Sequence, residues 1–275
     1  MNRILVPTDF SEHAEYAMKV AANLAKKHNG VIYLMHMLEL PFHNKVDVAG
    51  SHGEPPEALF YKKLAEKQFD DFLDKPYLDG IEIHETVKAD ISFSEIKDAC
   101  REHDIDLIVM GSHGASGLKE MFIGSNAEKV VRNSDIPVLV IKNNHDSFNI
   151  SNFVFASDFK NDNKETYKQA AEFAKNFGAN VHLLMVNTPN NFTTTSIANK
   201  RISDFIKDVD YDSYSVNIYN DESVEKGILN FSKEVDADII GISTHGRQGI
   251  AHFFNGSISE DLVNHAKRPV ITFKI

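Results

Sequence analysis

A glycine-rich segment occurs twice in the chain, once in each half. His113-Gly114, Gly117 and Gly124-Ser125 return as His245-Gly246, Gly249 and Gly256-Ser257, and the offset is constant (246 − 114 = 132). The pair Asp9-Phe10 returns as Asp158-Phe159 at an offset of 149 (158 − 9), so the first half has 17 more residues (149 − 132) between the two motifs. A repeat of this size is a whole domain, far longer than a solenoid unit. The sequence predicts a tandem duplication with domains at 1–145 and 146–275.

The composition restricts the compartment and the partners. The 275 residues suffice for two domains of ordinary size. The single cysteine, Cys100, excludes a disulfide framework and favours a reducing compartment, and no apolar stretch approaches the roughly 20 residues that span a bilayer. The net charge of −11 argues against nucleic acid or an anionic membrane as a main partner, because such binding needs a basic face. We expect a cytoplasmic protein without a signal peptide that binds neither nucleic acid nor membrane.

Strand-like and helix-like patterns alternate along both halves. Short apolar runs predict strands at 3–8, 31–38, 81–87, 105–110 and 137–141, then at 153–157, 181–186, 214–218, 237–242 and 270–275. Residues between them recur at helical spacing, as in the helix that follows Ser11, whereas 39–56 is predicted as a loop. This alternation is typical of α/β proteins, in which parallel strands are covered by helices on both faces through right-handed crossovers.

The first glycine segment has the features of a phosphate-binding turn. It follows the strand 105–110 and precedes a helix that begins near Gly124. Backbone N–H groups at a helix N-terminus have no intrahelical partner, and a phosphate group satisfies them while glycine permits its close approach. Ligands of such sheets bind outside the carboxyl ends of the strands, where the strand order reverses. If the first and fourth strands are neighbours there, Asp9 faces the same crevice, and the backbone of Met37 forms the base-side wall.

These motifs together resemble the universal stress protein family. The resemblance rests on Pro7-Thr8-Asp9-Phe10-Ser11, on His36, and on the pattern Gly111-x-x-Gly114, nine residues, Gly124-Ser125 before a final Pro-Val strand. It implies an open five-stranded parallel sheet in each domain, a Rossmann-like fold of the adenine nucleotide alpha hydrolase type. It also implies a pseudo-dimer in which the last strands of the halves pair antiparallel. The glycine pattern is that of the ATP-binding branch, so the resemblance implies ATP or AMP as the ligand, with Mg²⁺ held through the nucleotide at Asp9 as an open alternative.

The candidate nucleotide-contacting residues follow from matching positions in both halves. In the first half they are Pro7, Thr8, Asp9, Met37, Met110, Gly111, His113, Gly114, Gly124, Ser125 and Asn126. In the second half they are Asp158, Val186, His245, Gly246, Gly256 and Ser257.

The second half departs from the pattern. Ser243 stands in place of Gly111, Ala156 in place of Pro7, and Lys160 in place of Ser11, although Gly246, Gly256 and Ser257 remain. The Cβ and hydroxyl of Ser243 can narrow the turn, yet a serine can also donate to a phosphate. We therefore expect asymmetry, with nucleotide binding favoured in the first half.

Simpler interpretations stay open for the individual residues. The glycines can be turn residues without a ligand, and Asp9 can serve only as a helix cap. His113 and His245 are more often solvated loop histidines than catalytic ones, and His36 fits a core histidine better than a ligand. Cys100 fits a structural residue, and Lys119 on the glycine loop either contacts a terminal phosphate or faces water. His43, Asp47 and His52 are weak candidate metal ligands on a loop.

We expect binding and not turnover. The Ser-Gly-Gly-x-Asp-Ser loop of pyrophosphatase-type ATP enzymes, the His-Ile-Gly-His tetrapeptide of nucleotidyl transferases and the Gly-x-x-x-x-Gly-Lys-Ser/Thr phosphate loop are all absent from the sequence. No general base with an orienting partner is evident. The hypothesis is a nucleotide-binding stress regulator with an unknown protein partner and an open possibility of homodimers. The alternatives are a scaffold module without nucleotide, or one half that binds a non-nucleotide ligand.

Overall fold

The computed structural model describes residues 1–38, 56–88, 93–112, 124–160, 164–244 and 262–274. The first half contains β1 (Arg3–Thr8), α1 (Glu12–His28), β2 (Val31–Met37), α2 (Pro56–Leu73), η1 (Pro76–Leu78), β3 (Glu82–Lys88), α3 (Phe93–Glu102), β4 (Leu107–Gly111), α4 (Ser125–Asn133) and β5 (Val138–Ile141). The second half contains β6 (Asn152–Ala156), α5 (Lys164–Lys175), β7 (Asn180–Asn187), α6 (Thr195–Ile206), β8 (Tyr214–Asn220), α7 (Val224–Glu234), β9 (Ile239–Thr244) and β10 (Val270–Lys274).

The strands of the described residues form one ten-stranded sheet in the order β3-β2-β1-β4-β5-β10-β9-β6-β7-β8. Neighbouring strands are parallel except β5 and β10, which pair antiparallel with Val270 opposite Val140 and Ile271 opposite Leu139. The α/β fold, the five parallel strands of each half and the internal pseudo-dimer are thereby confirmed. β1 and β4 are neighbours, as the crevice argument requires. The domain boundary at residue 145 stays a prediction.

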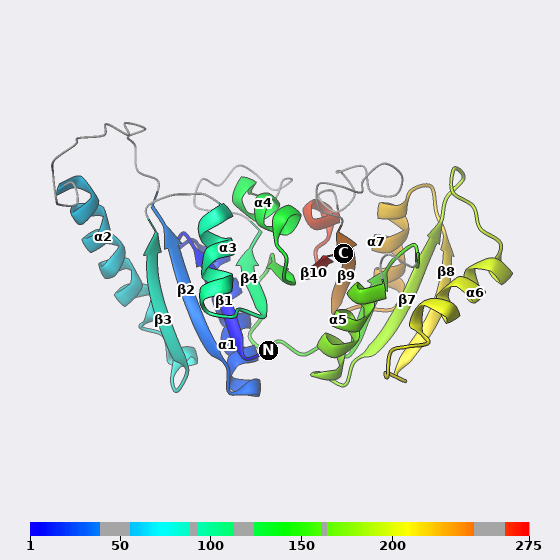
Figure 1. Cartoon of the computed structure of the whole chain (residues 1–275), viewed down its shortest axis with the longest axis horizontal. Helices are drawn as coiled ribbons and strands as arrows, with labels where there is room; N and C mark the ends of the chain where they lie inside the picture. Colours follow the sequence, from blue (N-terminus) through cyan, green and yellow to red (C-terminus); the bar gives the residue numbers. More distant parts are fainter. Residues whose placement is uncertain (39–55, 89–92, 113–123, 161–163, 245–261, 275) are drawn as a thin grey trace.

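Two apolar layers sandwich the sheet and run through both halves. One packs α1, α2, α5 and α6 against one face, and the other packs α3, α4 and α7 against the opposite face. The alternation of a strand divides its residues between the layers: Leu139 and Ile141 belong to the first, Val138 and Val140 to the second. Figure 1 shows the two halves side by side, with α2 and α6 at the outer ends. Both faces of the sheet are covered, which is why the strands read as continuous apolar runs.

The helix ends follow ordinary capping chemistry. The Ser11 side chain accepts from the Ala14 N–H at the start of α1, and Asn29 ends that helix in the left-handed conformation with φ 52°. α2 begins at Pro56, three residues before the predicted helix at 59, within the region predicted as a loop. A proline at the first helical position has no N–H that the first turn would leave unpaired, so it starts a helix rather than preventing one.

Candidate functional site

The turn after β1 places Asp9 at the carboxyl end of the sheet. The Thr8 hydroxyl oxygen accepts from the Phe10 N–H at 3.0 Å, and the Asp9 carboxylate accepts from the Ser11 N–H at 3.1 Å. Phe10 adopts a left-handed φ of 61°, a conformation that is costly for a large side chain. The Asp9 side chain is exposed while Thr8 is buried, so the turn presents the carboxylate outward.

Aromatic packing holds this strained turn. The Phe10 ring lies 4.5 Å from the His36 ring and 5.1 Å from the Phe69 ring, centroid to centroid. His36 Nδ1 lies 2.8 Å from the Thr8 carbonyl oxygen, and because that oxygen only accepts, Nδ1 donates in this contact. His36 is therefore a packing residue that buttresses the Asp9 turn, in agreement with its interpretation as a core histidine.

Gly111 lies where the end of β4 meets the first turn of α1. A Cβ at this position would stand 2.7 Å from both the carbonyl carbon and the oxygen of His13, closer than real Cβ contacts. The absence of a side chain at Gly111 is thus required by the helix, before any ligand is considered. The sequence indicates a phosphate-binding or a turn role for this glycine but not its role in helix packing, because His13 and Gly111 are far apart in the chain.

α4 begins beside the same strand end. Gly124 caps it with φ −59° and ψ 143° and carries no side chain that could cap the helix, and its N–H donates to the Ser112 carbonyl oxygen at 2.8 Å. The first α4 residues offer N–H groups without an i−4 helical acceptor, and the first intrahelical bond runs from the Glu128 N–H to the Gly124 carbonyl at 3.0 Å. The N-terminus of α4 and the Asp9 turn therefore lie at the carboxyl ends of two adjacent strands, β4 and β1.

The other candidates divide into described and undescribed residues. Pro7 and Met110 are buried, Met37 is half-buried, and Asn126 is exposed. Lying outside the described residues are His113, Gly114, His245, Gly246, Gly256 and Ser257, together with Lys119, His43, Asp47 and His52. Within the part that the structure describes, no group of three or more His, Cys, Asp or Glu side chains is arranged to hold a metal ion. Burial raises the pKa of the Cys100 thiol to about 11, so this cysteine is a packing residue and a poor nucleophile.

Comparison with known proteins agrees with this architecture. The sequence model of the Universal stress protein family matches residues 1–142 and 149–274. The chain belongs to the universal stress protein family. A universal stress protein of Methanocaldococcus jannaschii is 37% identical over 153 residues, which cover 51% of this chain and 94% of that protein. One of Synechocystis is 21% identical over the full length of both chains, and so has the tandem form.

The solved structures agree in fold. The crystal structure of a universal stress protein from Archaeoglobus fulgidus superposes with a TM-score of 0.70 at 21% identity, covering 99% of this chain and 96% of the other. Among the described helices of the present chain, none is both long and apolar enough to cross a membrane.

The second domain contains the same turn, but the surroundings of its carboxylate differ. Ser157 and Asp158 accept from the N–H groups of Phe159 and Lys160 in the same way, and Phe159 has φ 53°. Here, however, the Asp158 side chain is 4% exposed and its carboxylate lies 3.0 Å from the Lys160 ammonium. The lysine that replaces Ser11 thus pairs its ammonium with the carboxylate of this turn.

The hydroxyl of Ser243, the residue that replaces Gly111, also has a hydrogen-bond partner within the protein. Ser243 Oγ lies 2.9 Å from Thr166 Oγ1 of α5, and both residues are buried. Its hydroxyl points into the α5 interface, so the idea that Ser243 serves a phosphate receives no support from its contacts.

The part of the crevice that the described residues line, at the ends of β6 and β7, is narrow. A cavity of about 10 Å³ remains there between the strand ends and α7, which is space for about one water molecule. It is lined by Ala156, Ser157, Asp158, Leu184, Val186, Val224 and Ile228. α7 packs closely over β7, since a Cβ at Gly227 would stand 2.5 Å from a methyl carbon of Val186, the residue that matches Met37.

Proposed function

We propose that the first half binds an adenine nucleotide, ATP or AMP, and that the protein is a cytoplasmic stress-response regulator that holds this ligand without appreciable turnover. The observation that carries the proposal is the meeting of two groups at adjacent strand ends: the N-terminal amides of α4 and the exposed carboxylate of Asp9. Amides and helix dipole suit the phosphates, and a carboxylate suits ribose hydroxyls. The glycine spacing of the ATP-binding branch of the family supports the same ligand.

Magnesium would enter this site with the nucleotide. Mg²⁺ is commonly bound through one or two carboxylates together with substrate phosphates, and Asp9 supplies one carboxylate. We propose a role for Asp9 of this kind, which predicts tighter ATP binding in the presence of Mg²⁺ than in its absence. AMP, with a single phosphate group, would show a smaller dependence.

A proline substitution at the start of α4 tests whether the amides of this helix bind the phosphates. Ser125→Pro removes one amide donor from the first position of α4, where proline is tolerated, and the ψ of 143° at Gly124 suits a following proline. We expect ATP affinity, measured by calorimetry, to fall about tenfold, as for the loss of one charge-assisted hydrogen bond. The matched control is Thr195→Pro at the exposed start of α6 in the second half, after Thr194 with ψ 149°. Absence of heat with wild-type protein at millimolar ATP would remove the proposal.

The second half favours the alternative function, a module of the same fold that does not bind nucleotide. Its carboxylate is paired with Lys160, and the cavity that the described residues leave beside that carboxylate has space for about one water molecule. We propose that this half supports the first and contributes to the surface read by a protein partner, either another protein or a second copy of the chain. Calorimetry then gives one nucleotide per chain. A stoichiometry of two would contradict this division of roles.

A further inference from the structure

The two halves meet where β5 pairs with β10, a region called the joint below. Two lysines at equivalent positions reach across it (274 − 142 = 132). Lys142 directly follows β5, and its ammonium donates to the Asn264 carbonyl oxygen at 2.5 Å. Lys274 ends β10, and its ammonium lies 3.5 Å from the Asn133 carbonyl oxygen. Because β5 and β10 pair antiparallel, each lysine reaches from its own half into the other.

Both acceptors belong to the helices that follow the glycine segments. Asn133 is the last residue of α4, and Asn264 lies in the helical stretch 262–265. The last carbonyl groups of a helix have no intrahelical partner, and a cation there is favoured by the helix dipole. α4 has nine residues, a length of roughly 13 Å at 1.5 Å per residue. One end of this short helix thus meets a lysine of the second half, while its other end carries the amides assigned to the phosphates.

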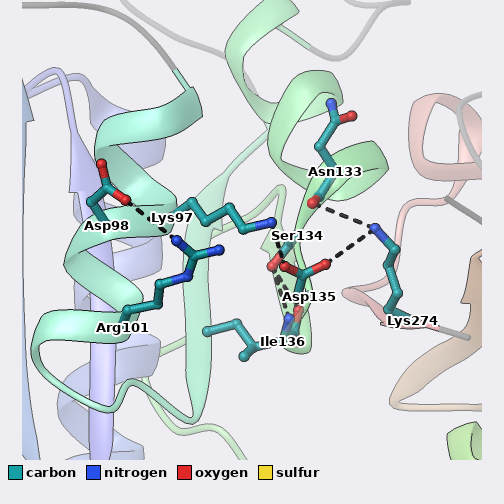
Figure 2. Close-up of polar contacts among 8 residues, drawn as sticks. All are labelled: Lys97, Asp98, Arg101, Asn133, Ser134, Asp135, Ile136 and Lys274. Atoms are coloured by element: carbon teal, nitrogen blue, oxygen red, sulfur yellow. Dashed lines mark hydrogen bonds and ion pairs between the residues drawn. The ribbon is translucent and has the colours of Figure 1, made fainter. Parts of the chain in front are cut away.

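An acidic residue holds Lys274 in place. The Asp135 carboxylate lies 3.5 Å from the Lys274 ammonium and 2.7 Å from the Lys97 ammonium of α3 (Figure 2). The hydrogen bond from Lys97, with further attraction from Lys274, lowers the pKa of Asp135, so the carboxylate stays charged. Only 19% of the Lys274 side chain is exposed. Asp135 therefore connects α3, the turn after α4 and the last strand of the other half.

The mirror-related lysine lacks this anchor. Position 267 corresponds to 135 (267 − 135 = 132), and it is occupied by a lysine. Among the described residues, no carboxylate lies within ion-pair distance of the Lys142 ammonium. Of these two equivalent positions, only the one that follows α4 carries a carboxylate.

We propose that Lys274 is a positioning residue for the nucleotide site of the first half: from the second half it holds the C-terminal end of α4, and so sets where the N-terminal amides of that helix lie. This inference rests on the proposed function of the first half. It assigns the second half a specific part in that function, since removal of one side chain from β10 disturbs a ligand on the far end of α4. By linkage, bound nucleotide should in turn protect the joint.

Two measurements on the full-length protein test the inference. Lys274→Met keeps most of the aliphatic stem and removes the charge, Lys274→Arg keeps the charge, and Lys142→Met is the matched control on the mirror-related helix. Hydrogen exchange of residues 125–133 is measured without nucleotide, and ATP affinity is measured by calorimetry. We expect Lys274→Met to exchange several-fold faster in α4 and to bind ATP roughly two- to fivefold more weakly, the range typical of a charge at a helix end. Lys274→Arg and Lys142→Met should leave both quantities near the wild-type values.

The outcomes distinguish failure of the positioning role of Lys274 from failure of the proposed nucleotide binding. Wild-type binding of ATP with unchanged affinity in Lys274→Met overturns the positioning role and leaves the proposed function standing. Weaker binding in Lys142→Met of the same size shows general weakening of the joint and also overturns it. If the wild type binds no ATP, the proposed function fails, and unchanged exchange in α4 of Lys274→Met then shows that the lysine does not hold the helix either.

Discussion

The two copies of the turn after the first strand share their hydrogen bonds and differ in the exposure of their carboxylates. Both use a hydroxyl and a carboxylate to accept from the next residues, and both hold a phenylalanine at positive φ. Asp9 nevertheless faces outward, while Asp158 is buried against Lys160. The turn is fixed by the fold, because its aromatic residue packs into the core in each half. The side chain two positions later differs between the halves, since Ser11 caps α1 and Lys160 pairs with Asp158.

A second pair of equivalent residues, Gly111 and Ser243, also differs in its surroundings. Gly111 is the last residue of β4 and Ser243 the second-last residue of β9, and each meets the first helix of its half. His13 approaches Gly111 so closely that a Cβ would collide with its backbone, whereas Thr166 receives the Ser243 hydroxyl. Loss of this glycine in the second half is thus matched by a change in the helix that covers it. The two halves therefore differ in how the first helix packs against the end region of the fourth strand.

Gly111→Ser places in the first half the residue found in the second, and we expect it to have the largest effect on stability. The new Cβ would stand 2.7 Å from the His13 backbone, so α1 must shift, and we expect a loss of about 3 kcal/mol in the free energy of unfolding, measured by urea titration. Ser243→Gly is the reciprocal control. It removes one buried hydroxyl contact and should cost about 1 kcal/mol. Equal effects of the two substitutions would show that the halves do not differ in helix approach.

Asp9→Asn and Asp158→Asn compare the two carboxylates. An asparagine oxygen still accepts from the Ser11 N–H, so Asp9→Asn removes charge without removing the turn. We expect calorimetry to show roughly tenfold weaker binding of Mg-ATP, about 1.4 kcal/mol. Asp158→Asn should leave ATP binding unchanged, since that carboxylate is occupied by Lys160. A weakened affinity in Asp158→Asn would instead place a ligand in the second half.

Much of the fold could be predicted because its signals are local. Period-two and period-3.6 patterns marked nearly every strand and helix, and the repeated motifs marked the duplication. The antiparallel pairing of β5 with β10 was expected only from the family resemblance. The apolar run Val138 to Ile141 predicts a strand but does not indicate which strand it pairs with. Pro56 shows the limit of local rules, since the same residue both ends loops and starts helices.

The site was harder to predict because its decisive contacts join distant residues. Asp9 and Asp158 look alike in the sequence, and only the structure shows that one is exposed and the other is buried. The replacement of Ser11 by Lys160 was visible and was the available signal for this difference. Nothing near Gly111 indicates that His13 lies against it, and nothing near Asn133 indicates that Lys274 lies 3.5 Å away.

Asp135→Asn tests the difference between the two lysine contacts at the joint. Removal of the anion leaves the ammonium groups of Lys97 and Lys274 near each other without a carboxylate between them, and we expect a loss of about 1 kcal/mol, the upper end for a partly exposed network. Thermal unfolding measures it, and 1 M salt should reduce the loss through screening. Asp98→Asn is the control, because Asp98 pairs only loosely with Arg101 within α3, at 3.8 Å. A salt-independent loss would argue for packing in place of charge.

The smallest predicted effect concerns pH and the unanchored lysine. Burial lowers the pKa of Lys142 from 10.5 to about 8, so below pH 8 the residue is charged in both the folded and the unfolded chain and the cost of burying the charge is present in full. Between pH 8 and 10.5 the folded protein loses this proton before the unfolded chain does, and stability contributed by this residue rises with pH. Because the ammonium is only half-buried, we expect a rise of about 0.5 kcal/mol, well below what the whole shift implies. Urea titrations of wild type and Lys142→Met at pH 7.5 and 9.5 measure the difference, which should vanish in the variant. Lys274→Met should leave the rise in place, and a rise that disappears in that variant instead would assign the titrating group to the anchored side of the joint.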